Sequence, residues 1–488
     1  MEKICLLDLE GTLIENEFLV ELASLNGSAQ RVSEITEFAM SGRICLEDAI
    51  KERIGLIKGI TKTDAECLLL KTKIRDGAFE FVRRLNETGW RVVVATNGFM
   101  FFAKPICDEL GIREVYANEL VFENGEIVSA TISVDKGNVA EKFSGKGNVL
   151  VAVGDGANDV AMFRHASVSF AFGNRGEVAE HADFSVSDFF SLAGILDSGF
   201  VVASSDSVPS GLNGKVLRFE SRADLERRLP VASALVVRSQ KIDALLIGMA
   251  PNLKVIIRQG VGTDNIDVQA ASARGIETLN TPLSAPSVAE LTIGFMVNAS
   301  RRIPCMDSEM KRGVWRERSE VMGSELFGKK IGVVGLGRIG SIVARICHAM
   351  GLHVSYYDPF VEETSYEKKF SLNELLSCSD IITFHVPLAP ETTHLLNAEN
   401  AWLVKRGAIV INTSRGKVIA KGALDVLLGS GVASVVCLDV HYEEPADYSA
   451  FREFENLILT PHIGGNTFEA QERMASRVKE ILSQRGFG

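Results

Sequence analysis

The chain has 488 residues, of which 46% are hydrophobic and 24% are charged, and its formal net charge is −11. This length predicts about two to four domains with a large buried core, and the negative charge argues against a nucleic-acid partner. No stretch reaches the roughly 20 apolar residues of a membrane-spanning helix, and the first residues lack the apolar run of a secretory signal. The eight cysteines are scattered without CxxC pairs, which is typical of reduced thiols. We therefore expect a cytoplasmic protein that binds neither membranes nor nucleic acids.

The first predicted strand, residues 4–7, ends at Asp8 and continues into Leu9-Glu10-Gly11-Thr12. Residues 17–72 then show amphipathic helical periodicity that is interrupted near Gly27, Gly42 and Gly59. We expect this segment to form a helical cap inserted after the first strand.

Polar residues also follow later apolar segments. The predicted strand 92–95 ends at Thr96-Asn97-Gly98, and Lys136 follows a β-like stretch at residues 127–134. The predicted strand 149–153 leads into a loop that carries two aspartates and an asparagine. Open α/β sheets bind ligands at the carboxyl ends of their strands, and aspartates, a hydroxyl and a lysine suit a phosphoryl group with Mg²⁺. Taken alone, the acidic loop is equally consistent with a solvated strand–helix turn.

In chain order, Asp8-x-Glu10-Gly11-Thr12, Thr96, Lys136 and Gly154-Asp155-Gly156-x-Asn158-Asp159 resemble the four motifs of the haloacid-dehalogenase-type phosphatases, most closely the phosphoserine phosphatases. The resemblance covers about residues 1–200. It implies that Asp8 forms a phosphoaspartate and that Glu10 acts as general acid and then as general base. It also implies a Mg²⁺ site made by Asp8, the backbone carbonyl of Glu10 and Asp155, with Asp159 supporting it through water.

The same resemblance implies a set of substrate-binding residues: Glu17 at the substrate amine, Arg53 at its carboxylate, Thr96 and Lys136 at the phosphoryl oxygens, Asn158 at the mouth of the site, and Asn97. Two positions depart from the family pattern, since the family usually has Asp at position 10 and Gly at position 97. Glutamate at the first position also occurs in relatives that transfer phosphate to homoserine. Phosphate transfer therefore remains an alternative to hydrolysis.

Residues 204–214 are rich in Ser, Gly and Pro, which is typical of a flexible linker. We expect four parts on this basis and on the motifs that follow. They are a phosphatase domain over 1–200, a linker over 201–214, a substrate-binding domain over 215–287 and 462–488, and a nucleotide-binding domain over 288–461.

A dinucleotide-binding fingerprint lies in the second half of the chain. The predicted strand 330–334 leads into a Gly-x-Gly-x-x-Gly turn and an apolar-periodic helix to about Met350, and a strand over 353–357 ends at an aspartate. Such glycines let the backbone approach a pyrophosphate at a helix N-terminus, and an acid about 20 residues later binds the ribose hydroxyls. Because a 2′-phosphate would meet the negative charge of that acid, we expect NAD rather than NADP. The predicted contacts are Gly335, Gly337, Arg338, Ile339, Gly340 and Asp358.

Further buried strands at 381–386, 409–412 and 435–438 predict a doubly wound sheet. Arg415, Glu444 and His462 follow strands of this half, and they provide the cation, the orienting carboxylate and the base that oxidation of a 2-hydroxy acid requires. Each residue alone is more often structural. The three in this order and spacing resemble the D-isomer-specific 2-hydroxyacid dehydrogenases, over nearly all of 215–488.

This second resemblance implies that His462 is the general acid/base, that Glu444 orients it and raises its pKa, and that Arg415 binds the substrate and polarises its carbonyl. The residues implied at the nicotinamide side are Pro387, Thr413, Asp439 and His462.

Within that family the D-3-phosphoglycerate dehydrogenases fit best, with Arg238 and Arg258 at the substrate phosphate and Gly262 at its carboxylate. There are three departures from their pattern. The first strand–helix unit is shortened at 215–229, and the loop 283–287 lacks the Gly-Asn that usually precedes the next helix. No regulatory domain is expected after Gly488.

Together these patterns predict an α/β protein with a haloacid-dehalogenase-type Rossmannoid domain and helical cap, then a flavodoxin-like substrate domain and an NAD-binding Rossmann domain. The expected activities are Mg²⁺-dependent hydrolysis of O-phosphoserine and NAD-dependent oxidation of 3-phosphoglycerate to 3-phosphohydroxypyruvate, which are the last and first steps of the phosphorylated route to serine. One alternative is a hydroxypyruvate or glyoxylate reductase fused to a phosphotransferase or another small-molecule phosphatase. A non-catalytic metabolite sensor is a further alternative. By resemblance we also expect a homodimer formed through the nucleotide domain.

Overall fold

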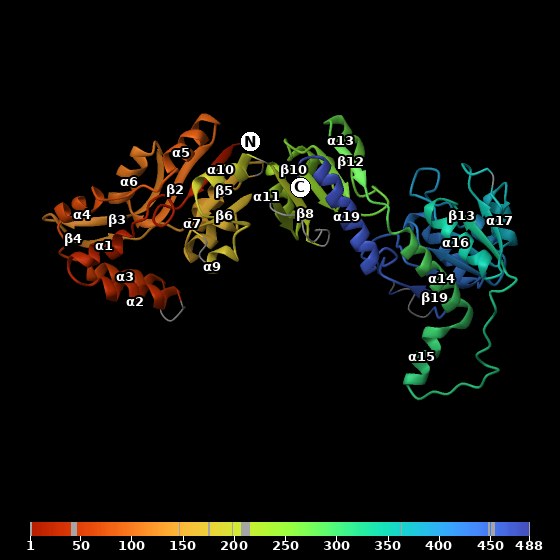
Figure 1. The fold of residues 1–488 in the computed structure, drawn as a ribbon. Helices are drawn as coiled ribbons and strands as arrows, with labels where there is room; N and C mark the ends of the chain where they lie inside the picture. The colour runs from red at the N-terminus through yellow and green to blue at the C-terminus, as the bar shows by residue number, and fades with distance from the viewer. Residues whose placement is uncertain are drawn as a thin grey trace. The chain divides into compact units, whose positions relative to one another are not determined.

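The computed structural model describes residues 2–40, 46–145, 147–173, 176–197, 199–205, 215–362, 364–447, 449 and 454–487. The chain divides into two compact units. The first comprises Met1–Ile256, Asp267–Thr278 and Arg485–Gly488, and the second comprises Ile257–Ile266 and Leu279–Gln484. Figure 1 shows their helices and strands. Within the described ranges, every helix is too short or too polar to cross a lipid bilayer.

The first unit begins with a seven-stranded sheet in the order β4-β3-β2-β1-β5-β6-β7. The central strand β1 pairs in parallel with both β2 and β5. Because parallel neighbours end at one edge of a sheet, the loops after β1 and β5 meet there, as the sequence predicts. The strands are β1 (Lys3–Leu7), β2 (Arg91–Phe99), β3 (Glu114–Glu123), β4 (Glu126–Thr131), β5 (Val149–Gly154), β6 (Val168–Phe172) and β7 (Phe184–Val186).

The predicted helical cap follows β1 and consists of α1 (Phe18–Leu25), α2 (Ala29–Met40), α3 (Leu46–Leu56) and α4 (Lys62–Leu69). Gly27 and Gly59 interrupt it with φ angles of 82° and 81°, a conformation that glycine adopts without steric cost. The third predicted break, at Gly42, lies outside the described residues. The other helices of this module are α5 (Ala78–Glu87), α6 (Met100–Glu109), α7 (Lys136–Phe143), α8 (Val160–Phe163), α9 (Gly176–Ala179) and α10 (Phe189–Asp197).

A second, five-stranded sheet has the order β12-β11-β10-β8-β9. Its strand β8 (Phe200–Ser204) is fully buried and pairs in parallel with β9 (Val216–Phe219) and β10 (Ala232–Val237). The predicted linker over 201–214 is therefore wrong for residues 201–204. Those residues form an interior strand of the sheet. The prediction failed because both neighbours of this strand come later in the chain, and local composition does not reveal such a pairing.

The same strand changes one of the departures noted above. Residues 215–229 are not the first unit of their sheet, because β8 precedes them in that sheet. Residues 206–214 lie outside the described ranges. The remaining elements of this part are β11 (Val255–Arg258), β12 (Glu277–Asn280), α11 (Arg222–Arg228), α12 (Ala244–Gly248) and α13 (Val268–Ala273).

The second unit contains a seven-stranded parallel sheet in the order β15-β14-β13-β16-β17-β18-β19. Apolar residues of α14 and α16 cover one face of the sheet, and those of α17 and α18 cover the other, which makes it doubly wound. Its strands are β13 (Lys330–Val334), β14 (His353–Tyr357), β15 (Glu367–Lys368), β16 (Ile381–Phe384), β17 (Ala408–Asn412), β18 (Ala433–Leu438) and β19 (Leu457–Leu459). Its helices are α14 (Ala285–Arg301), α15 (Ile303–Lys311), α16 (Arg338–Ala349), α17 (Leu372–Cys378), α18 (Lys421–Gly429) and α19 (Phe468–Gln484).

Candidate active sites

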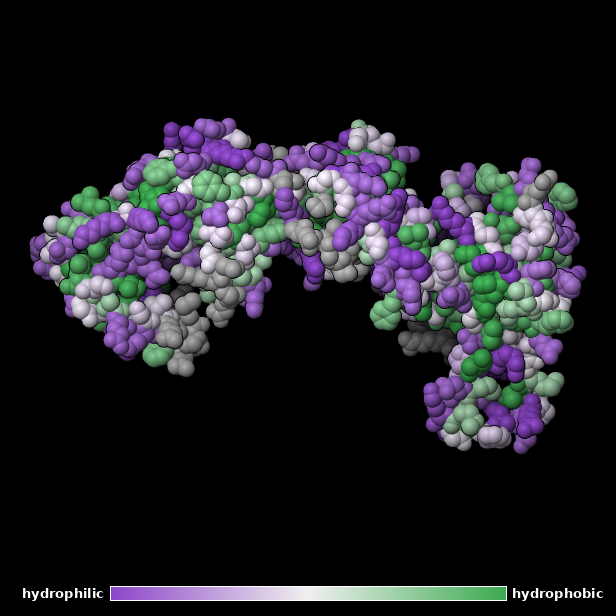
Figure 2. Space-filling model, in the orientation of Figure 1, coloured by the Kyte–Doolittle hydropathy of each residue, from purple (hydrophilic) through white to green (hydrophobic). Residues whose placement is uncertain are grey.

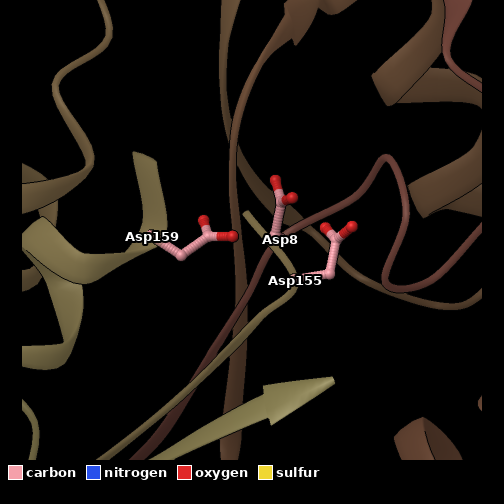
Figure 3. A group of neighbouring side chains, drawn as sticks. All are labelled: Asp8, Asp155 and Asp159. Atoms are coloured by element: carbon pink, nitrogen blue, oxygen red, sulfur yellow. The ribbon is translucent and has the colours of Figure 1, made fainter. Parts of the chain in front are cut away.

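Three buried aspartates meet at the carboxyl edge of the first sheet (Figure 3). Asp8 follows β1, Asp155 follows β5, and Asp159 ends the short 3₁₀ helix Ala157–Asp159 that comes next. Their ligand oxygens all lie within 4.8 Å of one another, so they could hold one metal ion. Gly11, with φ 79°, lies against the carboxylate of Asp155, where a side chain at position 11 would collide with it. The predicted metal-binding aspartates are thus brought together by the fold.

Lys136 is buried among these carboxylates. Its Nζ donates to Asp8 Oδ1 at 2.7 Å and to Asp159 Oδ1 at 2.6 Å. Burial disfavours its charge, yet the two carboxylates hold the pKa of Lys136 above its usual range. The pKa of Asp8 is also raised, because burial and the charges of Asp159 and Asp155 outweigh the attraction of Lys136. One buried lysine does not neutralise three buried carboxylates, so the site fits a hard divalent cation such as Mg²⁺.

The second oxygen of Asp159 accepts from the backbone N–H of Gly156 at 2.9 Å. Both of its oxygens therefore have protein partners, and its supporting role at the metal stays a prediction. Asn158 is exposed beside Gly156, at the mouth of the same loop.

Glu10 lies next to the segment of β2, Thr96 to Gly98, that is predicted to bind the phosphoryl group. A side chain at Gly98 would collide with its carboxylate, and Thr96 Oγ1 accepts from the backbone N–H of Gly98 at 3.0 Å. Burial, together with the charge of Glu17, raises the pKa of Glu10 to about 7. A carboxyl group that titrates near neutral pH can both donate and accept a proton during turnover.

The two residues predicted to bind the amino-acid part of the substrate also lie near Glu10. Burial lowers the pKa of Arg53, while the charges of Glu10 and Glu17 oppose that change. The guanidinium of Arg53 is held on α3 and α2, by the carbonyl of Ala49 at 3.3 Å and by Thr36 Oγ1 at 3.2 Å. Glu17 is exposed at the start of α1.

Arg75 is a residue that the motifs did not reveal. Its Nη2 donates to the carbonyl of Gly11 at 2.9 Å and its Nε to that of Thr12 at 3.1 Å, so it holds the loop that follows Asp8, the predicted nucleophile. A lone arginine after the cap has no sequence signal of its own. Only the return of the chain from the cap to the sheet brings it to this loop.

In the second unit, the three fingerprint glycines have separate roles. A side chain at Gly335 (φ 90°) would collide with the carbonyl of His385, and one at Gly340 would collide with the carbonyl of Gly335. A Cβ atom at Gly337 would have no described heavy atom within 4 Å, which leaves space for a phosphate group at the start of α16. Arg338 and Ile339 follow in the first turn of that helix. This arrangement fits a bound dinucleotide.

Asp358, at the end of β14, accepts from the backbone N–H of Leu336 and from that of Phe360, each at 2.8 Å. These bonds fix its carboxylate beside the glycine turn, in the place expected for the ribose-binding acid.

His462 and Glu444 form the predicted pair. His462 Nδ1 lies 2.8 Å from Glu444 Oε2, and the backbone N–H of His441 donates to the other carboxylate oxygen at 3.1 Å. Burial opposes the change, but the hydrogen bond and charge of His462 lower the pKa of Glu444, which keeps it ionised. Asp439, expected at the nicotinamide, is buried beside the loop of His462, where its carboxylate accepts from the N–H groups of Ile463 and Gly464 at 2.7 and 2.8 Å.

The other predicted residues of this unit are placed as follows. The guanidinium of Arg415 packs against the backbone of Gly262 and its Nε donates to Asp264 Oδ2 at 2.8 Å, so two residues expected to bind the substrate lie together. Thr413 is buried and shares a hydrogen bond with Thr292 at 3.0 Å, while Pro387 is exposed after β16.

The two arginines expected at the substrate phosphate lie at strand ends. Arg238 directly follows β10 in the first unit, and Arg258 ends β11, with its guanidinium against Gly260 in the second unit. Their joint contact with one phosphate group stays a prediction.

Comparison with known proteins assigns two separate parts of the chain to two families. Residues 2–167 match the family of haloacid dehalogenase-like hydrolases, and residues 293–464 match the NAD-binding domain of D-isomer specific 2-hydroxyacid dehydrogenases. A D-3-phosphoglycerate dehydrogenase from Methanocaldococcus jannaschii is 41% identical over 273 residues, which is 54% of this chain and 52% of that protein. The chain spans about half the length of the curated D-3-phosphoglycerate dehydrogenases it matches.

A hydroxypyruvate reductase from Thermotoga maritima is 41% identical over 265 residues, which is 53% of this chain and 86% of that protein. The crystal structure of a D-lactate dehydrogenase from Aquifex aeolicus, in complex with NAD and lactic acid, matches with a TM-score of 0.53 and 29% identity, over 58% of this chain and 94% of that one. The chain therefore belongs to the D-isomer-specific 2-hydroxyacid dehydrogenase family and carries a haloacid dehalogenase-like hydrolase domain at its N-terminal end.

Proposed function

We propose that this chain is a bifunctional enzyme of serine biosynthesis, which hydrolyses O-phosphoserine with Mg²⁺ in its N-terminal module and oxidises 3-phosphoglycerate with NAD in its dehydrogenase part. The observation that carries the first activity is the buried contact of Lys136 with both Asp8 and Asp159, beside Asp155. A nucleophile, a cation and surplus carboxylates at one sheet edge are the elements of phosphoryl transfer.

In the first step, an oxygen of Asp8 attacks phosphorus and the bond between phosphorus and the serine oxygen breaks. Glu10 gives its proton to that serine oxygen, so serine leaves as a neutral alcohol. In the second step, Glu10 takes a proton from water, which attacks the phosphoaspartate and releases inorganic phosphate. Thr96 and Lys136 hold the phosphoryl oxygens throughout. Mg²⁺ bound by Asp8 and Asp155 would neutralise charge on the phosphoryl group.

Glu17 and Arg53 support an amino acid as the substrate, because their charges act on Glu10 and because a carboxylate and a guanidinium suit an ammonium and a carboxylate group. The test compares phosphate release from O-phosphoserine with that from phosphoethanolamine, which lacks the carboxylate. We expect Arg53→Met to raise KM for phosphoserine about tenfold or more and to leave phosphoethanolamine unaffected. Equal wild-type activity on both substrates would refute phosphoserine specificity, and activity that survives removal of divalent cations by a chelator would refute the role of Mg²⁺.

In the dehydrogenase part, His462 Nε2 takes the proton of the substrate 2-hydroxyl while Glu444 holds the opposite ring nitrogen. Arg415 binds the substrate carboxylate through paired hydrogen bonds. NAD held by the glycine turn and Asp358 would supply the hydride acceptor for this oxidation. Arg238 and Arg258 would bind the phosphate of 3-phosphoglycerate, for which a guanidinium is well suited.

The second candidate for this part is a hydroxypyruvate reductase, which the relative from Thermotoga maritima favours because this chain covers most of its length. The test compares NADH formation from 3-phosphoglycerate with that from unphosphorylated glycerate, in the wild type and in Arg238→Ala and Arg258→Ala. Substitutions that affect only the phosphorylated substrate would support the proposal. Equal losses on both substrates would favour the reductase.

The expected homodimer is also a proposal. Residues 303–328 carry exposed apolar side chains, among them Trp315, Met322 and Phe327, and Figure 2 shows hydrophobic residues among hydrophilic ones in this segment. A second copy of the chain would cover such a surface. Light scattering on the purified protein tests this, and we expect a dimer that Trp315→Glu converts to a monomer.

A further inference from the structure

The phosphoryl-binding segment of β2 departs from regular pairing. β2 and β3 pair in register up to Ala95↔Tyr116, and pairing resumes at Phe99↔Asn118. Three residues of β2, Thr96 to Gly98, therefore lie opposite the single residue Ala117 of β3. Such bulges are common next to active sites, because they change the direction of a side chain. They also leave backbone groups without partners in the sheet.

The side chain of Asn118 fills this gap. Only 1% of its surface is exposed, and its Nδ2 donates to the carbonyl of Asn97, inside the bulge, at 2.8 Å. Its Oδ1 accepts from the backbone N–H groups of Ser133 and Val134, at 2.9 and 3.1 Å. One buried amide thus connects the segment that carries Thr96 with the segment that leads to Lys136.

We propose that Asn118 is a positioning residue of the phosphatase site, which holds Thr96 and Lys136 at the spacing that a phosphoryl group requires. This proposal rests on the proposed hydrolase function of the module. The amide is suited to the task because it offers a donor to a carbonyl and an acceptor to two N–H groups at once. A displacement of about 1 Å in either segment would cost up to about 100-fold in activity.

Asn118→Asp separates the two connections. A carboxylate oxygen still accepts from Ser133 and Val134, but the oxygen that replaces Nδ2 repels the carbonyl of Asn97, so the variant disturbs only the Thr96 side. We expect KM for p-nitrophenyl phosphate and the inhibition constant of inorganic phosphate both to rise about tenfold. In a Thr96→Ala background, the same substitution should change them less than about twofold, because it acts through Thr96.

Asn148→Asp is the matched control. Asn148 also hydrogen-bonds to backbone groups: its Oδ1 accepts from the N–H of Glu2 at 3.0 Å and its Nδ2 donates to the carbonyl of Phe143 at 3.4 Å. It lies just before β5, at the end of that strand opposite Asp155. We expect it to change melting temperature without changing phosphate binding. If Asn118→Asp does not fold, Asn118→Ser, whose shorter side chain does not span the gap, takes its place.

The outcomes separate this proposal from the substrate proposal. Hydrolysis of p-nitrophenyl phosphate without hydrolysis of phosphoserine would refute the substrate and leave the test of Asn118 intact. If neither compound is hydrolysed, the rise in melting temperature caused by inorganic phosphate is compared instead, and we expect Asn118→Asp to reduce it. Unchanged phosphate binding in Asn118→Asp, or full additivity with Thr96→Ala, would overturn the positioning role.

Discussion

Lys136 Nζ lies 2.7 Å from Asp8 Oδ1 although 128 positions separate the two residues in the sequence. The contact forms because α7 begins at Lys136 on the same sheet edge at which β1 ends. It places the positive charge of Lys136 against the carboxylate proposed as the nucleophile and, through Asp159, against the acidic segment after β5.

Lys136→Met should abolish most of the phosphatase activity. Without the ammonium, the three carboxylates repel one another and the transferring phosphoryl group loses a counter-charge, so we expect kcat to fall about 100- to 1,000-fold. Phosphate release measures this. Lys142→Met on the exposed face of the same helix is the control and should retain activity. An active Lys136→Met variant would contradict the assignment.

The phosphatase should lose activity above neutral pH. Burial raises the pKa of Glu10 to about 7, so the group is protonated below that pH and unable to protonate the leaving serine above it. We expect kcat/KM to fall about tenfold per pH unit above this pKa. In Glu10→Gln the alkaline limb should vanish and activity should drop about 100- to 10,000-fold. The exposed neighbour variant Glu15→Gln should keep the wild-type profile.

Arg75→Met should weaken the loop of the nucleophile. Two buried carbonyls, of Gly11 and Thr12, would lose a charged donor, which costs about 1–3 kcal/mol of unfolding free energy. We also expect the phosphatase to need a higher Mg²⁺ concentration. Thr12, whose carbonyl Arg75 holds, donates through Oγ1 to Asp155, a predicted Mg²⁺ ligand. Chemical denaturation and Mg²⁺ titrations of phosphate release test both effects. Arg83→Met, at an exposed position on α5, should change neither.

Glu444→Gln should impair the dehydrogenase through His462. An amide can hold the ring nitrogen but does not stabilise the charged imidazolium, so we expect kcat for NADH formation to fall about 100-fold. NAD binding, measured by fluorescence titration, should not change. The adjacent Glu443 forms an ion pair with Lys421 and provides the control variant Glu443→Gln. Equal losses in both variants would indicate a general effect on this loop.

Much of the fold and of both sites was predictable because catalytic residues lie directly after apolar strands. The β14 strand and the glycine turn after β13 occur where the sequence predicts them, and Asp8 and Asp155 meet because parallel strands end at one edge. The predicted linker failed at residues 201–204 because a short apolar run does not specify its partners, and β8 pairs with strands that follow it.

The sequence by itself determined which family each half resembles, since the acidic motifs and the glycine turn are local patterns tied to strand ends. Only the tertiary structure decided which residues hold those groups in place. Arg75 and Asn118 bind backbone carbonyls, and Asp264 pairs with Arg415 across 151 positions. Backbone groups carry no residue-specific signal, so contacts with them emerge only when distant segments of the chain are packed together.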